Sequence, residues 1–169
     1  MQCHGYGGAG VAAILEAANA PKGSLYHHFP TGKEGLAIAA LGYLEGEVDT
    51  TLAGLVASSL SLGEILRALA KECGAWLEQT GFCQTPLVSA IAGGGAPAGV
   101  SAAANRARIR WINTLANSVE DQASASFALT VIEGGLTAAR LSNDLASLYE
   151  PIELAAKAID QTNMATLRR

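Results

Sequence analysis

The segment that decides the fold is Pro21-Lys22-Gly23-Ser24-Leu25-Tyr26-His27-His28-Phe29-Pro30. It holds a lysine, a tyrosine and two histidines between two prolines, and Thr31-Gly32-Lys33-Glu34 follows directly. Pro21 suits the first turn of a helix, because the N–H that it lacks would have no partner there. The segment therefore predicts a short basic and aromatic helix from about Lys22 to His28, with a composition suited to the major groove of DNA.

An apolar helix is predicted immediately before this segment. Its apolar residues recur at the spacing of one helix face: Val11, Ile14, Leu15 and Ala18. Asn19-Ala20-Pro21 then ends the helix, because the residue before a proline avoids the helical conformation. Leu25 and Phe29 are four residues apart and are expected to face this first helix. Two short helices joined by a tight turn form a helix-turn-helix.

The rest of the chain also has helical periodicity. We predict helices over about 33–57, 62–80, 87–92, 98–119 and 121–141, and a last helix that ends near residue 164. Two pairs have capping-box spacing, Thr31 with Glu34 and Ser61 with Glu64. The last helix has two possible starts, one with Ser147 as the cap and one with Pro151 as the first helical residue. Few stretches alternate β-branched residues, so the sequence predicts an all-α fold.

Composition favours a cytoplasmic protein that is not an enzyme. The 169 residues carry a formal net charge of −4, and the three cysteines lack metal-ligand spacing, so we expect no metal site. No apolar run approaches the roughly 20 residues that span a bilayer, and the first residues do not resemble a signal peptide. No catalytic triad, carboxylate pair or phosphate-binding loop occurs at a usable spacing, and no cofactor is expected.

Short motifs near the start of the chain can be compared with known families. They are Gly5-Tyr6, Gly10-Val11, Ile14-Leu15, Ala17-Ala18, the segment from Ala20 to Pro30, and Lys33-Glu34-Gly35-Leu36. Together these motifs resemble the DNA-binding head of TetR-type transcriptional regulators. Residues 30–34, with Gly81-Phe82-Cys83-Gln84-Thr85-Pro86 further on, are similar to the LmrA/YxaF-like branch of that family.

The resemblance implies two domains and a dimeric repressor. Residues 1–44 are expected to form the helix-turn-helix head, without the first helix that the family has before Gly5. Residues 45–169 are expected to form a helical body that dimerises and binds a small, apolar effector, which releases a pseudo-palindromic DNA operator. The alternative is a TetR-like dimeric ligand-binding module that has lost DNA binding.

The same resemblance gives the DNA-binding residues. Carried onto this sequence, they are Lys22, Gly23, Ser24, Tyr26, His27 and Lys33. Lysine side chains neutralise phosphates, and a tyrosine hydroxyl donates to phosphate oxygens. Glycine lets the backbone approach DNA closely, and serine is short enough to touch a base edge.

In the body, the effector-binding residues are predicted to be Cys73, Trp76, Trp111, Phe127 and Val131. Each of them can equally be plain core. The last two helices carry apolar residues that suit either a two-fold interface or the core of one chain: Leu136, Ala139, Leu148, Ile152, Ala155, Ala156 and Ile159. Gly134-Gly135 inside a helix indicates a close approach, either by a helix across a dimer interface or by a ligand that lies against the backbone.

Overall fold

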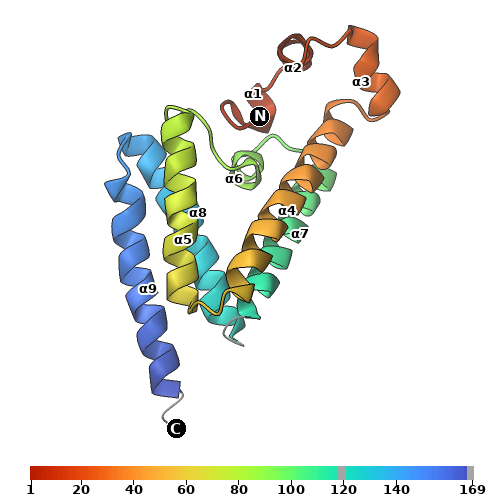
Figure 1. Ribbon diagram of the computed structural model, residues 1–169. Helices are drawn as coiled ribbons and strands as arrows, with labels where there is room; N and C mark the ends of the chain where they lie inside the picture. Colours follow the sequence, from red (N-terminus) through yellow and green to blue (C-terminus); the bar gives the residue numbers. More distant parts are fainter. Residues whose placement is uncertain (118–120, 167–169) are drawn as a thin grey trace. The chain divides into compact units, whose positions relative to one another are not determined.

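In the computed structural model, which describes residues 1–117 and 121–166 with side chains to Thr162, the regular secondary structure is helical (Figure 1). The all-α prediction is therefore confirmed. The helices are α1 (Gly5–Gly8), α2 (Val11–Ala17), α3 (Lys22–His28), α4 (Lys33–Ala57), α5 (Leu62–Gln79), α6 (Leu87–Ala92), α7 (Ala98–Ala116), α8 (Gln122–Ser142) and α9 (Ala146–Thr166). None of them, within the described residues, is long and apolar enough to span a bilayer.

The chain forms two compact units. One consists of residues 1–47 and 86–108, and the other of residues 48–85 and 109–169. The first unit therefore contains α6, which packs against α1, besides the helix-turn-helix. A head that ends at residue 44 remains a prediction.

The helix-turn-helix is formed by α2 and α3, which pack against each other. Leu15 and Leu25 are buried, one from each helix. The turn between the helices contains Asn19 at φ +49°, a left-handed conformation that asparagine tolerates better than most residues. Pro21 then precedes the first residue of α3, as its fixed φ favours. Local sequence signals thus give both helices their predicted positions.

The second unit is built around α5, α8 and α9, which pack against one another (Figure 1). The Ser61 side chain accepts from the Glu64 amide at 3.1 Å, and the Glu64 carboxylate accepts from the Ser61 amide at 2.8 Å. This arrangement confirms the predicted capping box. At the other pair, α4 starts after Gly32, whose carbonyl accepts from Leu36 N at 3.1 Å. Gly32 therefore takes the cap position that was predicted for Thr31.

The apolar residues of α8 and α9 that suited two interpretations are core residues of the single chain. All seven are buried: Leu136, Ala139, Leu148, Ile152, Ala155, Ala156 and Ile159. At Gly135 the two helices approach closely, because a Cβ atom there would lie 2.9 Å from Leu148 Cδ1. Gly134 has open space around it. Helix packing within one chain thus explains one of the paired glycines.

The last helix starts earlier than either predicted position. It begins at Ala146, whose amide donates to Asp144 Oδ1 at 3.0 Å, and Pro151 lies inside it. Leu148 is fully buried in this first part of α9. Its burial offsets the hydrogen bond that Pro151 cannot donate.

Candidate functional site

The exposed face of α3 carries most of the predicted DNA-binding residues. Lys22, Gly23, Tyr26 and His27 are exposed, and Ser24 is half-buried. Leu25, in the middle of the helix, is only 3% exposed and fixes which face points inward. Nothing lies within 4 Å of a Cβ placed on Gly23. The helix therefore presents a short polar surface that includes an open stretch of backbone.

Tyr26 lies against the turn that joins α3 to α4. A Cβ atom on Gly32 would come within 3.2 Å of Tyr26 Cε1, and Gly32 has φ +62°. Both the conformation and the close approach favour glycine at this position. The Tyr26 ring therefore lies close to the Gly32 backbone, although 65% of the residue stays exposed.

Lys33 has a different environment from Lys22. Its ammonium group lies 4.4 Å from the centre of the Tyr6 ring, which is a cation–π distance. Tyr6 is buried, and burial raises the pKa of its hydroxyl, with a smaller contribution from the charge of Glu34. Lys33 thus stabilises the contact between the start of α4 and α1. The sequence does not indicate Tyr6 as the partner of Lys33, because no local pattern signals a contact between residues 27 positions apart.

The charge of the chain is unevenly distributed. Residues 1–44 contain two lysines and two glutamates, so the formal net charge of −4 belongs to the rest of the chain.

The two histidines of α3 lie edge to face with ring centres 4.9 Å apart. Among the residues that the structure describes, no three His, Cys, Asp or Glu side chains gather in a way that could hold a metal ion.

The predicted effector-binding residues all belong to the second unit but differ in burial. Trp111 on α7 is buried, Cys73 and Trp76 on α5 and Val131 on α8 are half-buried, and Phe127 on α8 is 47% exposed. Cys73 and Trp76 lie about one turn apart on one helix, as do Phe127 and Val131. No described pocket brings the five residues together, and their role stays a prediction.

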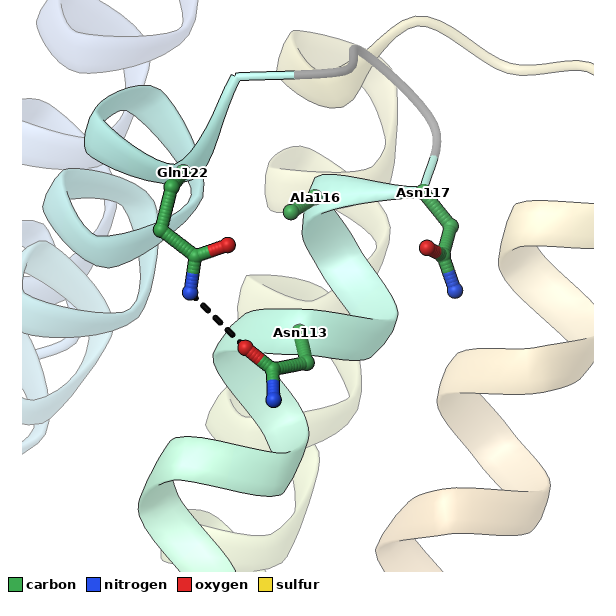
Figure 2. Close-up of a pocket in the computed structure, with 4 residues that line it drawn as sticks. All are labelled: Asn113, Ala116, Asn117 and Gln122. Atoms are coloured by element: carbon green, nitrogen blue, oxygen red, sulfur yellow. Dashed lines mark hydrogen bonds between the residues drawn. The ribbon is translucent and has the colours of Figure 1, made fainter.

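The second unit also has a surface hollow of about 450 Å³. Figure 2 shows its lining, which consists of Asn113, Ala116 and Asn117 from α7 and Gln122 from α8. Gln122 Nε2 donates a hydrogen bond to Asn113 Oδ1 at 2.8 Å. The hollow contains none of the predicted effector-binding residues. Three amides at an open surface can offer hydrogen bonds, but they lack the apolar enclosure of a typical small-molecule site.

The Cys73 thiol has low reactivity in this environment. Burial raises the pKa of its thiol to about 11, and the neighbouring charge of Glu72 contributes to the rise. Only the thiolate reacts with electrophiles, so a thiol with this pKa is mainly a small apolar side chain near neutral pH.

We expect Cys73 to resist alkylation in the folded protein. With a pKa of about 11, roughly one thiol in a thousand is ionised at pH 8. Iodoacetamide at pH 8, followed by peptide mass spectrometry, should label exposed Cys83 and leave Cys73 unmodified. Labelling of Cys73 should increase as the pH rises toward 11 or when urea unfolds the chain. Equal rates for Cys73 in the folded and unfolded chains would contradict the prediction.

The sequence is similar to those of known bacterial regulators. A family model described as bacterial regulatory proteins, tetR family, matches residues 1–40. The HTH-type transcriptional regulator LmrA of Bacillus subtilis (strain 168) is 39% identical over 72 residues, which are 43% of this chain and 38% of LmrA. The uncharacterized HTH-type transcriptional regulator YxaF of the same organism is 29% identical over 148 residues, which are 88% of this chain and 72% of YxaF.

The fold has a close counterpart among solved structures. The regulatory protein TetR from Rhodobacter sphaeroides superposes with a TM-score of 0.81, over 92% of this chain and 90% of that one, at 23% sequence identity. This likeness shows the fold.

Proposed function

Because the chain belongs to the TetR family of bacterial regulatory proteins, we propose that it is a ligand-responsive transcriptional repressor that binds DNA as a dimer. The observation that carries the proposal is the outward face of α3, with Lys22, Tyr26 and His27 exposed beside an open backbone at Gly23. Such a helix enters the major groove, with its first residues nearest the bases. Its setting in the cell is proposed to be the cytoplasm.

The proposed DNA contacts divide into two kinds. Lys22 binds a phosphate, and the Tyr26 hydroxyl donates to another, which together set the position of α3 on the duplex. Ser24 and His27 reach toward base edges. Lys33 contributes a further phosphate contact from the start of α4, next to its contact with Tyr6.

Replacing Lys22 with alanine should weaken DNA binding by about five- to tenfold near 0.1 M salt. The slope of the logarithm of the binding constant against the logarithm of the salt concentration should become shallower by about one. The DNA is a duplex selected by the protein from a random pool, and binding is measured by fluorescence anisotropy from 0.05 to 0.3 M salt. Lys71→Ala, at an exposed position of α5 in the other compact unit, makes the same charge change outside the helix-turn-helix and should leave both quantities unchanged.

The selected DNA is itself a test. A dimer should select a pseudo-palindrome with half-sites about one helical turn apart. Equal salt slopes for Lys22→Ala and the original protein would disprove the phosphate role of Lys22. A protein that dimerises and binds ligands but selects no sequence would instead be a dimeric ligand-binding module without DNA binding.

The proposed dimer interface uses the apolar side chains that α8 and α9 leave exposed. Leu141 is 83% exposed and Leu154 is 70% exposed. Large apolar side chains at this exposure are costly in water when several lie on one surface. Residues of one α8–α9 pair can pack on the same pair of a second chain in a two-fold arrangement.

Leu154→Glu should convert the dimer to a monomer, because two-fold symmetry places the new charge in the interface twice. Sedimentation velocity measures the change, and operator affinity should fall by at least tenfold, since one head then binds alone. Tyr43→Glu, at a 74% exposed position of α4, is the control and should remain dimeric. A dimeric Leu154→Glu protein would contradict the proposed interface.

The proposed effector acts through a difference in affinity between two states. It has to bind the arrangement that cannot hold DNA more tightly than the one that can, or it shifts nothing. The residues proposed to bind it remain Cys73, Trp76, Trp111, Phe127 and Val131. α4 runs from Lys33 to Ala57 and so belongs partly to each compact unit, which makes it the proposed relay.

A further inference from the structure

Trp111 carries a buried hydrogen-bond donor that has no acceptor within the described structure. The residue is 7% exposed, and its indole Nε1 is buried without a hydrogen-bond partner. An indole N–H can only donate. Buried polar groups in folded proteins are nearly always hydrogen-bonded, and each exception calls for an explanation. The group that completes Trp111 therefore has to be an acceptor.

Two other buried atoms in the described side chains lack a hydrogen bond, and both are carboxylate oxygens: Asp49 Oδ1 and Asp160 Oδ1. Their second oxygens lie near cations, Asp49 Oδ2 at 3.6 Å from Arg110 and Asp160 Oδ2 at 3.3 Å from Arg67. A neighbouring positive charge compensates a carboxylate in part. The indole of Trp111 is neutral, so a neighbouring charge cannot compensate for its missing hydrogen bond in this way.

The composition of the core limits the charge of the molecule that supplies the acceptor. Trp111 belongs to this core, and no polar or charged residue is buried among the residues that the structure describes. An ionised ligand would lose its hydration there without gaining an opposite charge. Building on the proposed effector function, we infer that the effector is a neutral, mainly apolar molecule with one hydrogen-bond acceptor, such as a carbonyl oxygen, which accepts from Trp111 Nε1.

The indole proton allows a direct test by nuclear magnetic resonance. The chain has two tryptophans, so a ¹⁵N–¹H correlation spectrum should show two indole signals, and Trp76→Phe assigns them. Acetophenone and ethylbenzene serve as probes, because they are similar in shape and only the ketone has a carbonyl acceptor. A larger pair, 2-acetonaphthone and 2-ethylnaphthalene, extends the range of size. A ketone should move the Trp111 proton downfield, and its hydrocarbon counterpart should not.

The affinities of the same probes provide the second measurement. A ketone should bind about three- to tenfold more tightly than its hydrocarbon counterpart, as expected for one neutral hydrogen bond. Trp111→Phe keeps an aromatic ring and removes the N–H, so the preference should fall to about one. A preference that persists in Trp111→Phe, or the absence of any preference in both probe pairs, would overturn the inference. Release of the selected DNA is measured separately: a ketone that shifts the Trp111 proton without releasing DNA would support an acceptor site at Trp111 and count against control of DNA binding through that site.

Discussion

Replacing Gly135 with alanine should make the protein about 1–3 kcal/mol less stable than replacing Gly134 with alanine. The two residues are adjacent on α8, and each change should gain about 1 kcal/mol from helix propensity. A Cβ on Gly135 would lie 2.9 Å from Leu148 Cδ1 and 3.4 Å from the Leu148 backbone, whereas a Cβ on Gly134 would meet nothing within 4 Å. Leu148 is fully buried, so its side chain has little room to move away from the new methyl group, and the cost falls on Gly135.

Urea unfolding of both variants measures this difference. The measurement uses the Leu154→Glu background, because the stability of a dimer depends on protein concentration and α8 belongs to the proposed interface. Gly134→Ala should be slightly more stable than its parent. Equal stabilities for the two glycine variants would show that α8 and α9 do not approach each other at Gly135.

The role of each of the paired glycines could not be predicted from the local sequence. Two glycines inside a helix predict a close approach, and the structure contains one. Nothing in the local pattern says which glycine makes it, because that depends on the position of Leu148 on another helix. The start of α9 illustrates the same limit: Pro151 was one of two predicted helix starts, yet the residues before it are already helical and bury Leu148.

Features encoded within a few residues were predicted more accurately. The positions of α2 and α3, the turn at Asn19 and the Ser61 capping box all follow from local spacing and side-chain chemistry. The family resemblance was carried by the same short stretch and is confirmed. An exposed surface on α3 could be predicted for that reason, since burial of Leu25 leaves the neighbouring side chains outside.

The body site depends on tertiary packing and was harder to predict. Phe127 has the spacing of a residue that faces inward with Val131, but it is 47% exposed. In the first unit, the contact of the Lys33 ammonium group with the Tyr6 ring also depends on tertiary packing and was not predicted. The buried Trp111 N–H has no counterpart in the sequence pattern, because a missing hydrogen bond is visible only after every neighbour is placed.

Leu148→Ala should lower the free energy of unfolding by about 2–5 kcal/mol, the usual cost of removing a buried leucine side chain. Leu148 is fully buried, whereas Leu141, in the same α8–α9 pair, is 83% exposed, so Leu141→Ala should change stability by less than about 0.5 kcal/mol. Both are measured by urea unfolding in the Leu154→Glu background.

The double variant Gly135→Ala with Leu148→Ala tests the contact between these residues directly. The alanine methyl group at residue 135 would occupy part of the space that Leu148 vacates, so the two costs should not add. We expect the double variant to be about 0.5–2 kcal/mol more stable than the sum of the single changes predicts. Additive costs would mean that Gly135 is required for a reason other than Leu148, such as the two remaining backbone contacts at 3.4 Å. A favourable coupling would show that residues 135 and 148 contact each other within one chain, so that the exposed Leu141 and Leu154 are the side chains of this helix pair left for a second chain.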